Sequence, residues 1–166
     1  GFKEFKDTNI RISANNIIGF PGESREDIMR TIEINRQINA DSVVVNAFRP
    51  YSGTKLRKIC IDKGLIPKEE RAEDNRVYGA FDNGVLKSLE LENIRKVFAL
   101  YVTFPKSRWK EIRNAETDDF LYNKMMEEFK SRQLFNRKNR DNRSESDNED
   151  IRAEDVFIND EEAVVI

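Results

Sequence analysis

Apolar positions in the first part of the chain predict two strands with a helix between them. The first strand is predicted over Ile10–Phe20, and it ends in the turn-forming run Gly19 to Gly22. The second is predicted over Ser42–Phe48. Its three consecutive valines lack polar alternation, which is typical of a strand covered on both faces.

The segment between the strands has the spacing of an amphipathic helix. Ser24 suits its N-cap, and Asp27 follows at the third position, where a carboxylate favours the exposed amides. Apolar residues recur at helical spacing up to Ile38, and the helix is expected to end at Asn39 to Asp41. Strand, helix and strand joined by short loops form a βαβ unit with parallel strands and a right-handed crossover.

Composition divides the chain into three predicted parts. Residues 1–66 carry the strands and a short helix over Thr54–Lys63. Residues 67–135 begin with a loop and are then helical from about residue 88, with Pro105 ending the first of their helices. Residues 136–166 form a polar and acidic tail, predicted to be disordered because it has too few apolar residues to offset its chain entropy.

Charge and cysteine content exclude several classes of function. The 166 residues include 29 Lys and Arg against 31 Asp and Glu, so the net charge of −2 argues against a generic nucleic-acid binder. Histidine is absent and Cys60 is the single cysteine, which excludes a disulfide framework and a self-contained thiolate or histidine metal site. Cys60 is expected to be a small buried helix residue, and Trp109 a packed aromatic beside solvated charges. No apolar run is long enough to span a membrane and no signal segment opens the chain, so we expect a cytoplasmic protein.

Candidate chemistry lies where the two predicted strands end. Ligands in parallel α/β proteins bind beyond the carboxyl ends of strands, and glycines there let a ligand approach the backbone. The candidate binding residues are, after the first strand, Gly19, Phe20, Pro21, Gly22 and Glu23, and, at the end of the second, Asn46, Ala47 and Phe48. A tight turn that needs glycine and proline for its geometry alone is the competing explanation.

The pair of motifs Asn16–Glu23 and Pro50–Thr54, about 30 residues apart, resembles the late strands of a radical S-adenosylmethionine enzyme barrel. More narrowly, it is similar to the branch that often carries an N-terminal cobalamin-binding domain. The clear resemblance covers about residues 10–66, and Leu91–Trp109 also looks like the helical tail of such proteins. The implied fold is α/β: the C-terminal strand–helix units of a partial TIM-type barrel, then a helical extension and the tail.

The resemblance implies that the loop Gly19–Glu23 and the strand end Asn46–Phe48 contribute to an adenine pocket for S-adenosylmethionine. For Glu23, contact with the ligand and orientation of the loop stay open as alternatives. The family binds a 4Fe-4S cluster through a Cys-x3-Cys-x2-Cys motif that this sequence lacks, so the cluster ligands are expected upstream of Gly1. Cobalamin is a candidate second cofactor.

The predicted function is therefore the C-terminal portion of a radical S-adenosylmethionine enzyme, inactive alone and without catalytic or metal-binding residues of its own. The intact enzyme would cleave S-adenosylmethionine reductively to a 5′-deoxyadenosyl radical, with cobalamin-dependent methyl transfer as one outcome. Expected partners are a small-molecule substrate, the N-terminal part of the same protein and an external electron donor, and no nucleic-acid partner and no membrane span are expected. Two alternatives are a non-catalytic α/β-helical interaction scaffold and a nucleotide-binding barrel half without iron.

Overall fold

A computed structural model describes residues 10–68 and 80–134 of the chain. Its described residues up to Met126 belong to one compact unit, and those from Glu127 to Leu134 to a second, which is helical. In the described ranges, no helix combines the length and apolar character needed to cross a membrane. The predicted disordered tail lies outside the described residues, as does most of the predicted loop over 68–84.

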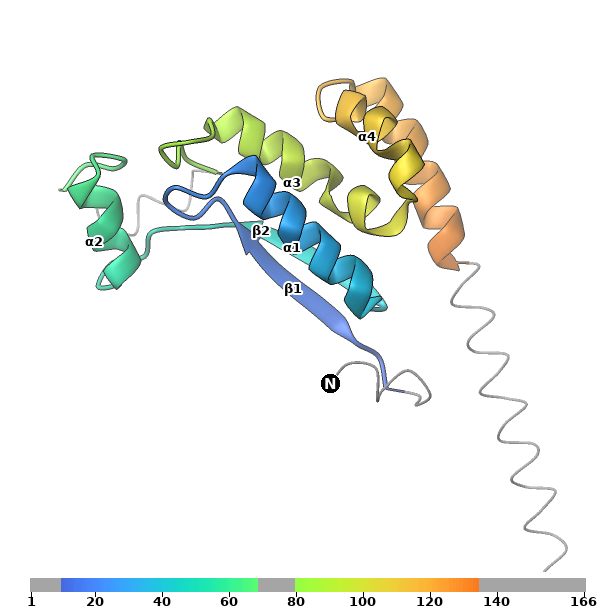
Figure 1. The fold of residues 1–166 in the computed structure, drawn as a ribbon, viewed down its shortest axis with the longest axis horizontal. Coiled ribbons are helices and arrows are strands. Elements are labelled where there is room, and N and C mark those ends of the chain that lie inside the picture. The colour runs from blue at the N-terminus through green and yellow to red at the C-terminus, as the bar shows by residue number, and fades with distance from the viewer. Residues whose placement is uncertain (1–9, 69–79, 135–166) are drawn as a thin grey trace, which may run out of the picture. The chain divides into compact units, whose positions relative to one another are not determined.

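The βαβ unit predicted from the sequence is present (Figure 1). Strand β1 (Ser13–Ile18) pairs in parallel with β2 (Ser42–Ala47), and helix α1 (Arg25–Ile38) connects them. Strand β1 is shorter than predicted at both ends. Its C-terminal limit has a local cause. Gly19 has a φ of +87°, which lies outside the extended region, so the strand cannot continue through it.

Helix α1 begins and ends as the sequence predicts. Ser24 is the N-cap, and its Oγ accepts a hydrogen bond from the Asp27 N–H over 3.2 Å. The Asp27 carboxylate accepts hydrogen bonds from Ser24 in return, which lower the pKa of Asp27. Asn39 closes the helix in the left-handed conformation, with a φ of +52°.

The two faces of the sheet have different surroundings. One face packs against the helices and consists of Ala14, Asn16, Ile18, Val43, Val45 and Ala47. The other face contains Ile17, which is 51% exposed, and Val44, which is 43% exposed. The prediction that the second strand is covered on both faces is therefore wrong for the described part of the chain, because its helices pack on one side only.

Further α-helices and a 3-10 turn follow the sheet in the described residues. They are α2 (Lys55–Asp62), α3 (Ser88–Thr103), the turn η3 (Lys106–Arg108) and α4 (Trp109–Ala115), and residues 119–134 are also helical. Helix α3 supplies much of the core and contacts both β2 and α1. Thr54 caps α2. Cys60 is buried, as predicted, and Met125 is buried as well.

The C-terminal end of α3 is held by α1. Arg36 Nη1 donates to the carbonyl oxygens of Tyr101, Val102 and Phe104 over 2.7, 2.8 and 2.6 Å. These are carbonyls that a helix end leaves without intrahelical partners, and the positive charge also suits the helix dipole. Trp109 packs edge-on against Tyr101, with ring centroids 5.5 Å apart, which confirms it as a packed aromatic.

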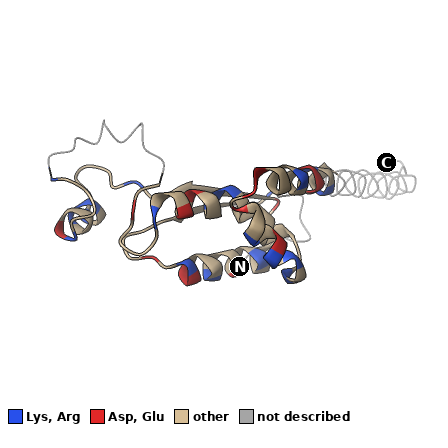
Figure 2. Cartoon of the chain, turned by 90° about the horizontal axis from the view of Figure 1, so that it is seen from above, with Lys and Arg blue, Asp and Glu red and all other residues tan. Residues whose placement is uncertain are grey.

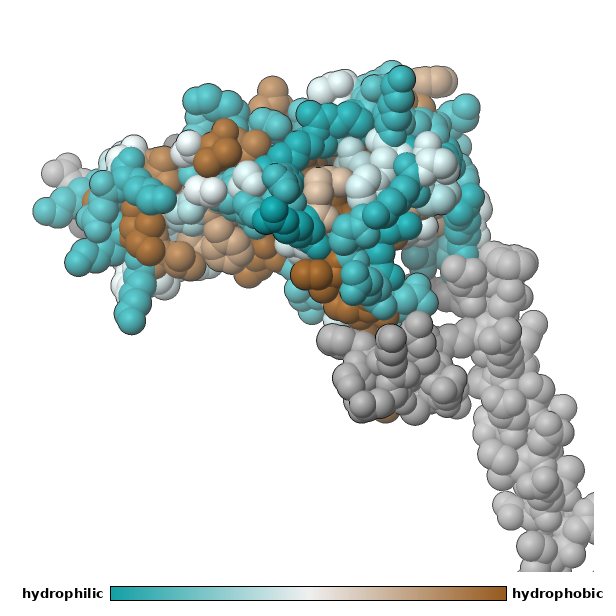
Figure 3. All heavy atoms as spheres, in the orientation of Figure 1, coloured by the Kyte–Doolittle hydropathy of each residue, from teal (hydrophilic) through white to brown (hydrophobic). Residues whose placement is uncertain are grey.

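Charged residues cover the outer surfaces of the helices, where both signs are interspersed (Figure 2). Apolar patches interrupt this hydrophilic surface (Figure 3). Large apolar side chains that remain exposed include Ile17 and Val44 on the sheet, Tyr51 before α2, and Leu56 and Ile59 on α2.

Candidate functional site

The parallel register brings the two candidate segments side by side. Ile18 pairs with Ala47, and the Phe48 N–H donates to the Ile18 carbonyl oxygen over 2.7 Å. Two residues after Ile18 and one residue after Ala47, the rings of Phe20 and Phe48 contact each other with centroids 4.9 Å apart. The loop after β1 and the end of β2 therefore form one continuous surface.

The loop after β1 depends on glycine at two positions. Gly19 and Gly22 both have a φ of +87°, a conformation that side-chain-bearing residues rarely adopt. A Cβ on Gly19 would also lie 3.3 Å from Leu91 Cδ1, so the start of α3 packs closely against this residue. The tight-turn explanation is thus correct in part, because the glycines are needed for backbone geometry whatever the loop binds.

Glu23 orients this loop. Its Oε2 accepts hydrogen bonds from the N–H groups of Gly19 and Phe20, the latter over 3.2 Å. Desolvation by burial raises the pKa of Glu23, and the two backbone hydrogen bonds lower it by a smaller amount. Of the two roles left open for Glu23, loop orientation is the one that its hydrogen bonds show.

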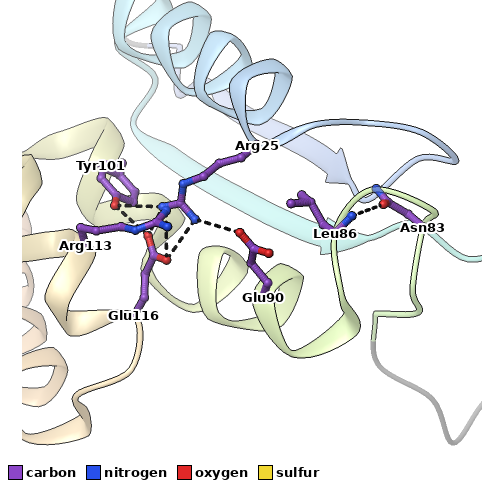
Figure 4. Close-up of polar contacts among 7 residues, drawn as sticks. All are labelled: Arg25, Asn83, Leu86, Glu90, Tyr101, Arg113 and Glu116. Carbon is purple, nitrogen blue, oxygen red and sulfur yellow. Dashed lines mark hydrogen bonds and ion pairs between the residues drawn. The ribbon is translucent and has the colours of Figure 1, made fainter.

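Asn83 holds the same loop from the other side, and sequence reasoning missed it. Its side chain is fully buried, and Nδ2 donates to the carbonyl oxygens of Phe20 and Glu23 over 3.0 and 2.9 Å. Its main-chain oxygen accepts from the Gly22 N–H over 2.8 Å. Asn83 Oδ1 in turn accepts from the N–H of Leu86 over 2.8 Å, which fixes the amide's orientation (Figure 4).

The remaining candidate residues differ in accessibility. Asn46 is exposed on the open face of the sheet, and Ala47 is half-buried on the covered face. Phe48 is only 7% exposed, because it packs between Phe20 and Phe81, whose ring centroid is 6.0 Å away. Asn46 and the loop thus offer polar groups at the surface, while Phe48 is buried against the loop residue Phe20.

A second polar cluster anchors the helix that follows the loop. Arg25, the first residue of α1, donates from both Nη atoms to the carboxylate of Glu116, which also accepts from the Tyr101 hydroxyl over 2.8 Å. Arg113 and Glu90 lie at its margin, with N–O distances of 3.6 Å to Glu116 and 3.8 Å to Arg25 (Figure 4). Burial and the bond to Glu116 raise the pKa of Tyr101, so its hydroxyl remains a donor.

The described residues do not fit an iron–sulfur cluster. Across residues 10–68 and 80–134, no group of three or more Cys, His, Asp or Glu side chains is placed to hold a metal ion. The single cysteine, Cys60, is buried in α2, and burial raises the pKa of its thiol. A cluster that requires three thiolates cannot be built from this chain, because the sequence contains one cysteine.

The sequence is similar to three named enzymes over part of its length. It is 39% identical over 67 residues to a probable threonylcarbamoyladenosine tRNA methylthiotransferase of Pyrococcus abyssi, which covers 40% of this chain and 15% of the relative. It is 32% identical over 69 residues to a tRNA-2-methylthio-N(6)-dimethylallyladenosine synthase of Herpetosiphon aurantiacus, covering 42% of this chain and 16% of the relative. The enzyme of that name from Treponema pallidum is 37% identical over 46 residues, 28% of this chain and 10% of the relative.

Part of this chain is thus similar in sequence to tRNA methylthiotransferases. The resemblance to radical S-adenosylmethionine enzymes is thereby confirmed. The match to the methylthiotransferases spans about one-sixth of their length or less. No family model matches the chain, and no solved structure matches it.

Proposed function

We propose that the chain supplies part of the adenosine-binding surface of a radical S-adenosylmethionine enzyme. The observation that carries this proposal is the parallel register that joins the Gly19–Glu23 loop to the end of β2. Backbone carbonyls, exposed Asn46 and the edge of an aromatic cluster suit a planar heterocycle with a few polar groups. S-adenosylmethionine is the ligand expected at this surface.

The remaining parts of the proposal concern the intact enzyme. Residues 1–66 would be the last strand–helix units of a partial TIM-type barrel, followed by the helical extension 67–135. The 4Fe-4S ligands and the methionine-binding residues would lie in a longer polypeptide, and a separate donor would supply the electron. The open sheet face with Ile17 and Val44 supports this arrangement, because further strands would cover it.

For the intact enzyme we propose first the reaction given in the names of the similar enzymes, methylthiolation of a tRNA nucleoside. This proposal departs from two expectations drawn from the sequence, an unspecified small-molecule substrate and the absence of a nucleic-acid partner. Cobalamin-dependent methyl transfer has no support among these relatives and is the second reaction to test. In both cases the 166-residue chain is expected to bind ligand weakly and to catalyse nothing alone.

The proposal is tested by titrating the ¹⁵N-labelled chain with S-adenosylhomocysteine, which carries the same adenosine group. Ligand-dependent shifts are expected at the amides of Gly19, Gly22 and Ala47. Gly64 is the internal control, because it follows α2 and lies outside both motifs and both candidate segments. Shifts confined to Gly64, or no shifts at millimolar ligand, would favour the non-catalytic scaffold.

A further inference from the structure

Helix α2 and the segments beside it carry an excess of positive charge that the net charge of −2 conceals. Residues 49–68 contain six Lys and Arg residues and a single acidic residue, Asp62. Four of the six cations are exposed lysines, namely Lys55, Lys58, Lys63 and Lys68. Glu69 and Glu70 follow in the sequence, outside the described residues. A local basic surface attracts polyanions even when the chain as a whole is weakly acidic.

The ammonium groups on this helix are not neutralised by neighbouring carboxylates. No ion pair or side-chain hydrogen bond joins any described residue to Lys55, Lys58 or Lys63. Lysines elsewhere in the described chain differ in this respect. Lys87 pairs with Asp82 over 2.9 Å, and Lys96 pairs with Asp119 over 2.8 Å. The three ammonium groups at α2 are therefore free to meet phosphate groups.

The exposed side of α2 combines these lysines with apolar side chains. Arg57 and Cys60 are buried on the other side of the helix, while Leu56 and Ile59 remain exposed. Figure 3 shows hydrophobic residues between hydrophilic ones over this helix, at the left. Tyr51, in the turn that leads into α2, is 59% exposed. Cations beside an exposed aromatic ring are typical of surfaces that bind single-stranded nucleic acids, where phosphates meet the cations and a base stacks on the ring.

The turn before α2 holds Tyr51 at the start of the helix. The Thr54 Oγ1 donates to the Tyr51 carbonyl oxygen over 2.8 Å and accepts from the Arg57 N–H over 3.2 Å. The same hydroxyl thus caps α2 and fixes the main chain of Tyr51 next to its first turn. Tyr51 and the lysines consequently belong to one local structure.

Lys63 connects this structure to the loop after β1. Its Nζ lies 3.5 Å from the position that a Cβ on Gly22 would take. Gly22 is exposed, so the ammonium group lies at the surface of the loop. A positive charge at that point favours an anionic group beside the proposed adenosine-binding surface.

We propose that Tyr51, Lys55, Lys58 and Lys63 form a docking surface for single-stranded RNA, the α2 basic surface. The lysines meet phosphates of the strand, and the ring of Tyr51 stacks on one base. Because Lys63 lies beside Gly22, a strand held here is led to the loop after β1. This inference rests on the proposed function, which favours RNA among the polyanions because the similar enzymes are named for tRNA.

The first test measures binding of the full chain to a fluorescently labelled single-stranded RNA of about 12 nucleotides. Fluorescence anisotropy is recorded over a range of salt concentrations for the unaltered chain and for the triple variant Lys55→Glu, Lys58→Glu and Lys63→Glu. The variant is expected to bind at least about tenfold more weakly at low salt. Its plot of log affinity against log salt concentration should be less steep by about 2, because each phosphate contact contributes about 0.7 to the slope.

A second triple variant is the matched control for this change in charge. Its substitutions are Lys110→Glu, Lys124→Glu and Lys130→Glu, at exposed lysines on α4 and the last described helix. Like the α2 lysines, these form no ion pair with any described residue. The control is expected to lose less than about threefold in affinity. Equal losses in the two triple variants would show that net charge alone matters and would overturn the proposal. If the α2 variant does not fold, the three lysines are replaced by glutamine in both sets.

The stacking contact has its own matched pair of variants. Tyr51→Leu removes the ring from the α2 basic surface, and Phe120→Leu removes a ring that is 82% exposed elsewhere. Tyr51→Leu is expected to weaken RNA binding at least about fivefold without changing the salt dependence, since no cation is lost. Phe120→Leu should leave the affinity unchanged. Equal affinities of the two variants would overturn the role of Tyr51.

Two further measurements separate this inference from the proposed function. Binding of S-adenosylhomocysteine without binding of RNA would overturn the α2 basic surface and leave the proposed function intact. RNA binding that the α2 variant weakens, without any binding of S-adenosylhomocysteine, would do the reverse. Vesicles containing phosphatidylserine test a membrane as the occupant instead, and the chain is expected to prefer RNA. Binding to these vesicles with none to RNA would overturn the proposal.

Discussion

Arg25 and Glu116 form a two-pronged ion pair although 91 residues separate them in the sequence. One prong joins Nη1 to Oε2 over 3.1 Å. Arg25 is the first residue of α1 and directly follows the candidate loop and its cap, while Glu116 follows α4. The pair therefore fixes the start of α1, and with it the exit of the loop, to the C-terminal helices.

Replacing Glu116 should cost more stability than replacing a surface carboxylate. Glu116→Gln leaves the Arg25 guanidinium without its counter-charge in a largely buried setting, which should lower the free energy of unfolding by about 2 to 3 kcal/mol. Glu128→Gln removes an exposed ion pair with Arg132 four residues along a helix and should cost less than about 0.5 kcal/mol. Urea unfolding of both variants measures the difference in the free energy of unfolding. Equally small losses in the two variants would show that the Arg25–Glu116 pair stabilises the fold no more than an exposed ion pair does.

Gly19 and Gly53 provide a matched pair for separating backbone strain from packing. Both have positive φ, but an added Cβ meets Leu91 only at Gly19 and open space at Gly53. Gly53→Ala should therefore cost about 1 kcal/mol for the left-handed backbone, and Gly19→Ala at least about 1 kcal/mol more. Thermal unfolding of the two variants checks this, and a Gly19→Ala loss no larger than that at Gly53 would contradict the close contact.

Glu23 should make the loop respond to pH. Because burial raises its pKa above the ordinary value of 4.5, the folded protein holds this proton in a pH window where the unfolded chain has lost it. Stability should fall as pH rises through that window and then level off. Glu23→Gln should abolish this component while keeping an oxygen acceptor, and the difference between the two pH profiles isolates it from Asp27, whose pKa shifts in the opposite direction.

Glu23→Ala tests the same side chain by removing its hydrogen-bond acceptor. Alanine leaves the Gly19 and Phe20 N–H groups without their acceptor, which should cost about 1 to 3 kcal/mol. Glu23→Gln should be clearly more stable than Glu23→Ala at neutral pH. Equal stability of the two variants in chemical denaturation would mean that the carboxylate does not hold the loop.

Local signals in the sequence were sufficient for the elements that carry the candidate loop. A cap at Ser24, glycines at the turn and apolar spacing in α1 are short-range features, and each is found where it was predicted. The open sheet face does not follow from short-range signals of this kind. The run of three valines indicates a strand with a tendency to be buried. Whether helices pack on one face of that strand or on both depends on the tertiary structure.

The polar contacts that fix the site could not be predicted because their partners are distant in sequence. Asn83 lies 63 residues after Phe20, and no spacing or composition distinguishes it from other asparagines in polar segments. The Arg25–Glu116 pair is equally hidden among the many charges of the chain. The signal that was available, the motif pair around Gly19 and Pro50, pointed to the family and not to the residues that orient the loop.

Ile17 and Ile18 are neighbours on opposite faces of β1, and a polar substitution should lower stability far more at Ile18 than at Ile17. Ile18 is 1% exposed, so Ile18→Asn should cost about 3 kcal/mol or more. Ile17 is 51% exposed, so Ile17→Asn should cost less than about 1 kcal/mol and should reduce concentration-dependent association of the chain. Light scattering and thermal unfolding over a range of concentrations report both effects. A concentration-independent transition of the unaltered chain would contradict the open apolar face.

The central claim is that the two strand ends bind an adenosine group. The most direct measurement is a search for intermolecular nuclear Overhauser effects between the adenine protons of bound S-adenosylhomocysteine and the chain. Contacts are expected from the adenine H2 or H8 proton to side-chain protons of Pro21 and Asn46. Contacts only to α2 or to the helices after Ser88, with none at either strand end, would contradict it.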